Sequence, residues 1–153
     1  MEEELSKDIS GIRFAELIRN TLSIPKTDIK TYSPLTLAFI GDSIFDLIIR
    51  TCVVESGNAP VNKLHKRCSI LVQASAQADL YHTIKDDLTE EETAIFKRGR
   101  NAKSFTSAKN AGVVEYRTAT GLEALMGYLY LTDQTERLLE LIQPQINKMV
   151  NNS

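Results

Sequence analysis

The feature that most constrains the fold is the strongly apolar stretch from Ser33 to Arg50. Ser33 is a favourable N-cap residue, and Pro34 suits the first position of a helix, where its missing N–H is not needed. The apolar residues that follow surround the helix axis instead of forming one stripe, which is typical of a helix buried in a core. The sequence therefore predicts a buried central helix from Pro34 to about Glu55, ended by Gly57.

One acid, Asp42, lies in the middle of this apolar run, next to Gly41. Buried carboxylates are normally paired with a base or bound to a metal, so spacing alone leaves a structural and a functional role equally open. Gly41 would let another backbone or a ligand approach closely. Asp46, one turn later, is a possible accessory acid at the mouth of a site. A solvated helix residue is the favoured interpretation of Asp46.

Composition indicates one helical domain without a membrane span. The chain has 153 residues, of which 42% are hydrophobic and 25% charged, as is ordinary for a globular protein. It has only seven glycines and four prolines, and no sustained strand-like alternation. No apolar run reaches the roughly 20 residues that cross a membrane. Cys52 and Cys68 lack metal-ligand spacing and suit free thiols in a reducing cytoplasm.

Hydrophobic periodicity predicts further helices around the central one, so the predicted fold class is all-α. Two capping boxes, Thr89–Glu92 and Asp133–Glu136, mark helix starts. Residues 99–112 lack an apolar period and predict a polar loop. The helices that we expect, besides the central one, cover about 12–22, 60–67, 69–85, 89–98, 115–131 and 133–149.

A second acid, Glu123, lies inside another helix that is apolar over most of its circumference. If this helix packs on the central one, Asp42 and Glu123 converge. Two like charges in a poorly solvated place repel unless a cation or a shared proton separates them. Mg²⁺ prefers carboxylate oxygens and keeps water in its shell for a phosphate substrate. The pair therefore predicts a metal site suited to phosphodiester chemistry.

Residues 97–109 carry several basic residues and no acid, although the net charge of the chain is −2. They are a candidate contact for nucleic acid, because Lys and Arg can neutralise phosphates while amides and hydroxyls can bind phosphate or sugar. An ordinary solvated charge run is the alternative, and on composition alone it is favoured. The candidate contact residues are Lys97, Arg98, Arg100, Asn101, Lys103 and Ser104.

Three motifs, in this order, resemble the ribonuclease III family. Residues 37–44, Leu-Ala-Phe-Ile-Gly-Asp-Ser-Ile, resemble the signature helix of its catalytic domain. Residues 97–104, Lys-Arg-Gly-Arg-Asn-Ala-Lys-Ser, together with Tyr116-Arg117, resemble the smaller branch called Mini-ribonuclease III. Residues 123–131, Glu-Ala-Leu-Met-Gly-Tyr-Leu-Tyr-Leu, resemble the second acidic motif of the family. The resemblance covers roughly residues 33 to 145.

The resemblance implies an α-helical homodimer that cuts both strands of double-stranded RNA with Mg²⁺, or with Mn²⁺ in its place, and leaves 5′-phosphates. It implies that Asp42 and Glu123 are the catalytic, metal-holding acids, and that the basic stretch contacts RNA. It divides the chain into an N-terminal extension, 1–32, and a catalytic domain, 33–150, without a double-stranded-RNA-binding domain.

The branch further implies a bacterial, cytoplasmic enzyme that matures the large-subunit (23S) ribosomal RNA precursor. A large-subunit ribosomal protein is a candidate partner, and no membrane is involved.

Two positions depart from the larger enzymes of the family. The acid expected four residues before Asp42 is Ala38, and the acid expected three residues before Glu123 is Thr120. Mini-ribonucleases share this loss, which supports that branch and leaves the number of metal ions open. Two other functions stay open. One is a catalytically inactive module that binds double-stranded RNA, and the other is a helical interaction protein without salt-sensitive affinity for RNA.

Overall fold

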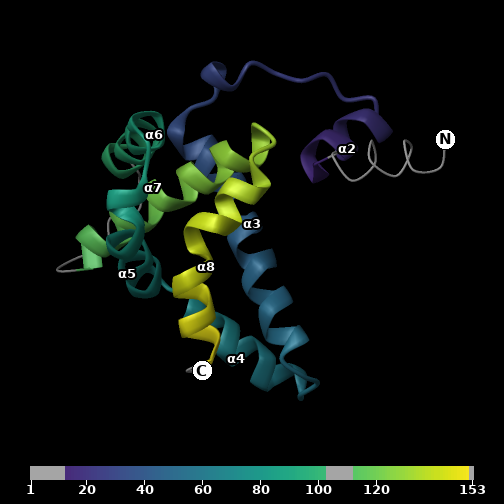
Figure 1. The fold of residues 1–153 in the computed structure, drawn as a ribbon, viewed down its shortest axis with the longest axis vertical. Coiled ribbons are helices and arrows are strands. Elements are labelled where there is room, and N and C mark those ends of the chain that lie inside the picture. Colours follow the sequence, from purple (N-terminus) through teal and green to yellow (C-terminus); the bar gives the residue numbers. More distant parts are fainter. Residues whose placement is uncertain (1–12, 103–111, 152–153) are drawn as a thin grey trace.

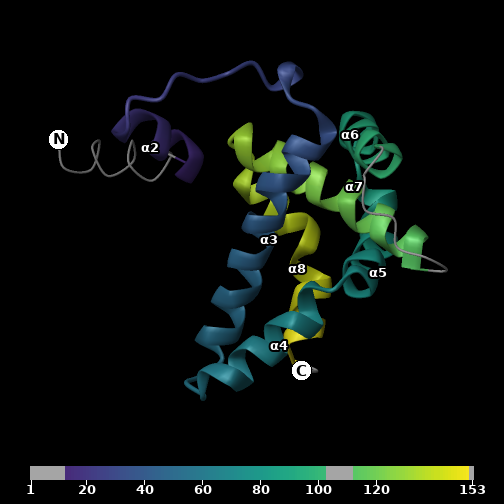
Figure 2. The ribbon, with the colours of Figure 1, turned by 180° about the vertical axis from the view of Figure 1, so that it is seen from behind.

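The computed structural model describes residues 13–102 and 112–151, and all of its regular elements there are helices (Figures 1 and 2). The predicted all-α fold is confirmed. Within these residues no helix is long and apolar enough to cross a membrane. The elements in chain order are α2 (Phe14–Thr21), η1 (Ile29–Thr31), α3 (Pro34–Glu55), α4 (Val61–Val72), α5 (Ala74–Ile84), η2 (Lys85–Asp87), α6 (Glu90–Asn101), α7 (Gly112–Leu131) and α8 (Thr135–Asn151).

The central helix α3 begins and ends where the sequence predicts. Ser33 Oγ accepts a hydrogen bond of 3.2 Å from the backbone N–H of Thr36, and Pro34 occupies the first turn. Gly57 follows the helix with a φ of +136°, a conformation that side chains rarely adopt. The N-cap and the glycine thus fix both ends of the helix that passes through the core.

The core is organised by the crossing of α3 and α7 (Figure 1). A Cβ atom at Gly41 of α3 would overlap the backbone carbonyl of Glu123, and one at Gly127 of α7 would overlap the carbonyl of Leu37. The two backbones can therefore approach this closely only because a glycine stands on each side. α7 is buried over most of its surface, and its fully buried side chains include Leu122, Ala124, Leu125, Met126 and Leu129.

α5 and α6 cover a further side of α7 (Figure 1). Tyr81 of α5 stacks on Phe96 of α6 with ring centroids 3.7 Å apart. At the start of α6 the predicted capping box is confirmed. The Thr89 hydroxyl accepts from the backbone N–H of Glu92, and the Glu92 carboxylate accepts from that of Thr89. The same carboxylate accepts two hydrogen bonds from Arg137 of α8, at 2.9 and 3.0 Å, which ties α6 to α8.

Several predicted boundaries are wrong by a few residues because packing outweighs local signals. The chain breaks at Gln73 and not near residue 68, since Cys68 and Leu71 are buried and keep α4 helical to its end. α6 continues through Gly99, which packs against Ala124 of α7, so the predicted loop 99–112 begins with a helical turn. α7 begins at residue 112, and the remainder of that loop, 103–111, lies outside the described residues.

The predicted capping box at Asp133 is also wrong. α8 begins at Thr135, and Asp133 precedes it with a φ of 61°, so its side chain is turned elsewhere. Its carboxylate accepts a 2.7 Å hydrogen bond from Arg19 of α2, and Lys26 lies 3.8 Å away. Asp133 therefore links the N-terminal segment to the end of α7 through this ion pair. The segment runs over one end of the bundle in Figure 2.

The Gly41→Ala variant should be strongly destabilised, because the added methyl group would force α3 and α7 apart. We expect the free energy of unfolding to fall by about 3 kcal/mol, more than the ~1 kcal/mol that Ala gains in helix propensity. Urea unfolding followed by circular dichroism measures this. Ser43→Ala, on the exposed side of the same turn, is the matched control and should change stability by less than about 0.5 kcal/mol. A Gly41→Ala protein as stable as the wild type would contradict the close crossing.

Candidate active site

The α3–α7 crossing brings Asp42 and Glu123 together. Asp42 directly follows Gly41, which packs against the backbone of Glu123. The two acids are close enough for the charge of Asp42 to act on the carboxyl of Glu123. Glu123 is half buried, whereas Asp42 is exposed. The expectation of two buried acids is therefore wrong for Asp42. This acid lies on a face of α3 that is not covered by any described element.

The same face of α3 leaves large apolar side chains exposed. Phe39 is 78% exposed, although it lies in the middle of the apolar run that predicted a fully buried helix. The helix is therefore buried on one side only within the chain as described. Exposed apolar residues of α3 besides Phe39 are Leu35, Leu47 and Val54.

The two acids influence each other. Burial, and then the negative charge of Asp42, raise the pKa of Glu123 from 4.5 to about 7. A hydrogen bond from the side chain of Gln77 acts in the opposite direction and lowers this pKa. A cation beside the pair would offset the repulsion from Asp42, which is the second of the two causes that raise this pKa.

Gln77 of α5 is a site residue that the sequence pattern does not reveal. Its side chain is 3% exposed, and its Nε2 donates a 2.9 Å hydrogen bond to the carbonyl of Val72. The available signal was a single amide within an apolar stripe, between Ala74 and Tyr81 at helical spacing. That signal shows a buried polar group but not its partner, which is the carbonyl at the end of α4.

Asp46 does not join the acid pair. Its carboxylate lies 2.9 Å from Nε of Arg50 on the same helix, and both side chains are substantially exposed. The two positions without the expected acids contribute no metal ligand. Ala38 is buried and apolar, and the Thr120 hydroxyl donates a 3.0 Å hydrogen bond to the carbonyl of Tyr116. In the part of the chain that the structure describes, no three His, Cys, Asp or Glu side chains are grouped to hold a metal.

Four of the six predicted RNA-contact residues lie on the last turn of α6. Lys97, Arg98 and Asn101 are exposed, and Arg100 is half buried over the ring of Phe96, with Cζ 5.8 Å from its centroid. Nε of Arg100 also donates to the side-chain oxygen of Asn101 at 3.2 Å. These residues are held by a helix, not by the predicted loop. The other two, Lys103 and Ser104, lie outside the described residues.

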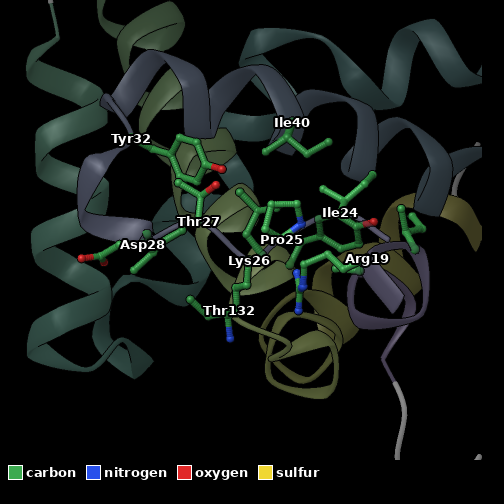
Figure 3. Close-up of a pocket in the computed structure, with 14 residues that line it drawn as sticks. Arg19, Ile24, Pro25, Lys26, Thr27, Asp28, Tyr32, Ile40 and Thr132 are labelled. Carbon is green, nitrogen blue, oxygen red and sulfur yellow. The ribbon is translucent and has the colours of Figure 1, made fainter. Parts of the chain in front are cut away.

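A cavity of about 680 Å³ lies between α2, the segment that follows it, and the ends of α3 and α7 (Figure 3). Its walls are mainly apolar, and Tyr32 and Ile40 line it from the side of α3 in Figure 3. Neither Asp42 nor Glu123 lines this cavity. The acid pair is thus separate from the hollow beside the N-terminal segment.

Comparison with known proteins identifies the family. A family model described as the ribonuclease III domain matches residues 35–134. Mini-ribonuclease 3 of Enterococcus faecalis is 50% identical over 124 residues, which are 80% of this chain and 94% of that protein. Mini-ribonuclease 3 of Clostridium tetani is 48% identical over 123 residues, 80% of this chain and 82% of that protein.

A solved structure agrees with the sequence matches. The crystal structure of protein FN1578 from Fusobacterium nucleatum superposes with a TM-score of 0.72 and 37% sequence identity. The match covers 79% of this chain and 98% of that chain. The family match spans α3 to α7 and so contains both acids and both crossing glycines. The chain therefore belongs to the ribonuclease III domain family and, within it, to the Mini-ribonuclease 3 endoribonucleases.

Proposed function

We propose that this chain is a Mg²⁺-dependent endoribonuclease that cleaves double-stranded RNA at the Asp42–Glu123 pair. The observation that carries this proposal is the glycine crossing, which holds two repelling carboxylates side by side with one of them open to solvent. Both acids stand in the motifs that resemble the family's acidic positions. The relatives named Mini-ribonuclease 3 support the reaction class.

Asp42 and Glu123 would hold the cation. Two adjacent carboxylates fit a hard divalent ion such as Mg²⁺, or Mn²⁺ in its place, which takes its remaining oxygens from water or phosphate. When bound, such an ion activates water and stabilises negative charge on a phosphodiester. Because the pKa of Glu123 is raised to about 7, binding of such an ion at neutral pH would displace the proton from those molecules in which this carboxyl is protonated. Asp42 and Glu123 would thus hold the cation at the phosphodiester, and hydrolysis would leave a 5′-phosphate and a 3′-hydroxyl.

The basic end of α6 supplies the contact to RNA. A-form RNA is held mainly through phosphates and 2′-hydroxyls, for which the exposed Lys97, Arg98 and Asn101 offer donors. Arg100, Lys103 and Ser104 complete the proposed contact. The bases of A-form RNA lie in a deep, narrow major groove that side chains cannot read, so the shape of a duplex is the proposed substrate feature.

A homodimer completes the proposed enzyme. The exposed apolar face of α3 suits burial against a second copy, which would place two acid pairs on one duplex for cleavage of both strands. Residues 33–150 form the proposed catalytic domain and 1–32 an N-terminal extension. The proposed substrate in the cell is the precursor of 23S ribosomal RNA in the bacterial cytoplasm, where the free thiols Cys52 and Cys68 are stable. A large-subunit ribosomal protein is a candidate partner there.

An inactive RNA-binding module is the second candidate, because Ala38 and Thr120 leave the site with two acids instead of four. A cleavage assay separates the two. Long duplex RNA is incubated with purified protein and Mg²⁺, or with a chelator, and the ends are mapped. We expect Mg²⁺-dependent cuts in both strands that leave 5′-phosphates. RNA that is bound but intact would support the binding module instead.

Asp42→Asn and Glu123→Gln should each abolish cleavage, because each removes a charge that holds the cation while keeping the shape of the side chain. Folding by circular dichroism and binding to duplex RNA should stay near those of the wild type, since the crossing is made by backbone and glycines. Asp79→Asn, an exposed acid on α5, is the matched control and should keep full activity. Full activity in either acid variant would exclude the metal site.

Replacing Arg98, Arg100 and Lys103 together with Ala should weaken RNA binding and flatten its salt dependence. Each basic side chain that no longer neutralises a phosphate lowers the slope of log K against log salt by about 1, so we expect a slope shallower by up to about 3. Filter binding at several salt concentrations measures it. A triple replacement of the exposed Lys63, Lys66 and Lys85 is the charge-matched control. Equal slopes for the two triple variants would count against the end of α6 as the RNA-binding surface.

A further inference from the structure

Arg100, near the end of α6, places its guanidinium over an aromatic ring. Its Cζ lies 5.8 Å from the centroid of the Phe96 ring, one turn earlier on the same helix. Its Nε donates a 3.2 Å hydrogen bond to the side-chain oxygen of Asn101. These two contacts restrict the orientation of the guanidinium, whereas the side chains of Lys97 and Arg98 on the same helix are exposed.

The Phe96 ring is itself fixed by two other helices. Phe96 is fully buried, and Tyr81 of α5 stacks on it with the ring planes inclined by only 10°. A Cβ atom at Gly121 of α7 would lie 2.7 Å from the ring, so the ring packs directly against the backbone of that helix. Gly121 lies two residues before Glu123. The ring thus ties the position of Arg100 to the helix that carries one acid of the site.

The guanidinium keeps most of its donors for a ligand. Among the described residues Arg100 forms no ion pair, and its two terminal NH₂ groups donate no hydrogen bond. A guanidinium with both NH₂ groups available can donate two parallel hydrogen bonds to one phosphate. A lysine ammonium would neutralise the same phosphate without fixing its orientation, because it is a point charge on a flexible stem.

We propose that Arg100 sets the register of duplex RNA on the acid pair by binding one backbone phosphate, and that Phe96 is a positioning residue that acts through Arg100. The inference rests on the proposed function, in which Asp42 and Glu123 cleave a duplex held by the end of α6. Exposed cations attract a duplex but let it slide along the surface. A guanidinium fixed relative to α7 holds one phosphate at a constant distance from the acids, so that another phosphate of the strand reaches the site of cleavage.

The competing role is structural, in which Arg100 only stabilises the end of α6 as a cation at a helix C-terminus. The variant Arg100→Lys separates the two roles, because Lys keeps the charge but loses the planar contact with Phe96 and the pair of NH₂ groups. Three quantities of the full chain are compared with the wild type. They are the affinity for duplex RNA in chelator, the single-turnover cleavage rate in Mg²⁺ at saturating protein, and the melting temperature.

We expect Arg100→Lys to bind duplex RNA within about twofold of the wild type, because the number of neutralised phosphates is unchanged. Cleavage at saturating protein should be slower by roughly 10- to 100-fold, since a misplacement of about 1 Å has effects of this size. A variant that cleaves at the wild-type rate would overturn the proposal, whether or not its melting temperature falls. Weaker binding as the only defect would overturn it too, because Arg100 would then supply charge alone.

Arg50→Lys is the matched control. It makes the same change at an exposed arginine whose guanidinium contacts the carboxylate of Asp46 instead of an aromatic ring. Affinity, cleavage rate and melting temperature should all stay near those of the wild type.

Phe96→Leu tests the second part of the proposal, because it removes the ring and leaves Arg100 in place. We expect a loss of cleavage similar to that of Arg100→Lys. The double variant should lose little more than either single variant, since both changes remove the same contact. Losses that multiply in the double variant would exclude Phe96 as a positioning residue.

A measurement on the wild-type protein keeps the proposal testable if Phe96→Leu does not fold or if the chain does not cleave RNA. The Nε–H group of Arg100 gives a ¹H–¹⁵N resonance, which is assigned by its loss in Arg100→Lys. On addition of duplex RNA in chelator we expect this resonance to shift while that of Arg50 stays in place. An unshifted Arg100 resonance at saturating RNA would overturn the proposal. If the wild type binds RNA without cleaving it, the proposed function fails, and a shift of this resonance still supports the phosphate contact of Arg100.

Discussion

The structure depends on the contact between two backbones at the α3–α7 crossing. Gly41 and Gly127 each face a carbonyl of the opposite helix, and a side chain at either position would separate the helices. Each glycine belongs to the same motif as one of the acids. Asp42 follows Gly41, and Glu123 lies one turn before Gly127. Packing and the placement of the acids are therefore set by the same few residues, and the backbone positions of the two acids stay close together while the core is intact.

The electrostatic interactions of the two acids at this crossing are unfavourable for the folded state. The half-buried Glu123 loses solvation and lies beside the charge of Asp42, and both effects raise its pKa to about 7. A protein without use for this pair could place an apolar residue at either position. The chain instead holds the two acids side by side at the crossing. Such local strain is typical of functional sites, where binding of a ligand offsets what the fold alone does not stabilise.

The sequence predicted the parts of the fold that depend on local chemistry. The Ser33 cap, the end of α3 at Gly57 and the capping box of α6 all follow from residues within one turn of one another. It did not predict features that depend on distant residues. The solvent exposure of Asp42 depends on which helices cover α3, and the partner of Asp133 is an arginine of α2, far away in the sequence. Helix α6 runs past Gly99 because α7 packs against it, which no local propensity indicates.

The sequence predicted that Asp42 and Glu123 converge, and it did not reveal the buried amide of Gln77. Asp42 and Glu123 stand out as charges in apolar helices, and motif order links them. Gln77 carries no charge, and its hydrogen bond to the carbonyl of Val72 depends on the break between α4 and α5, which exists only in the folded chain. A buried amide is difficult to interpret from one sequence, because buried amides also occur for purely structural reasons.

The ion pair between Arg19 and Asp133 has a consequence for the N-terminal segment. Its side chains are only 15% and 20% exposed, whereas Lys97 and Arg98 at the end of α6 are exposed. Mobile ions screen exposed charges strongly and partly buried pairs much less. As ionic strength rises, the exposed charges of α6 therefore lose their attraction for polyanions first, while the ion pair between Arg19 and Asp133 still holds α2 against the bundle. The ion pair that holds α2 and the proposed contact of α6 with RNA therefore differ in their sensitivity to salt concentration.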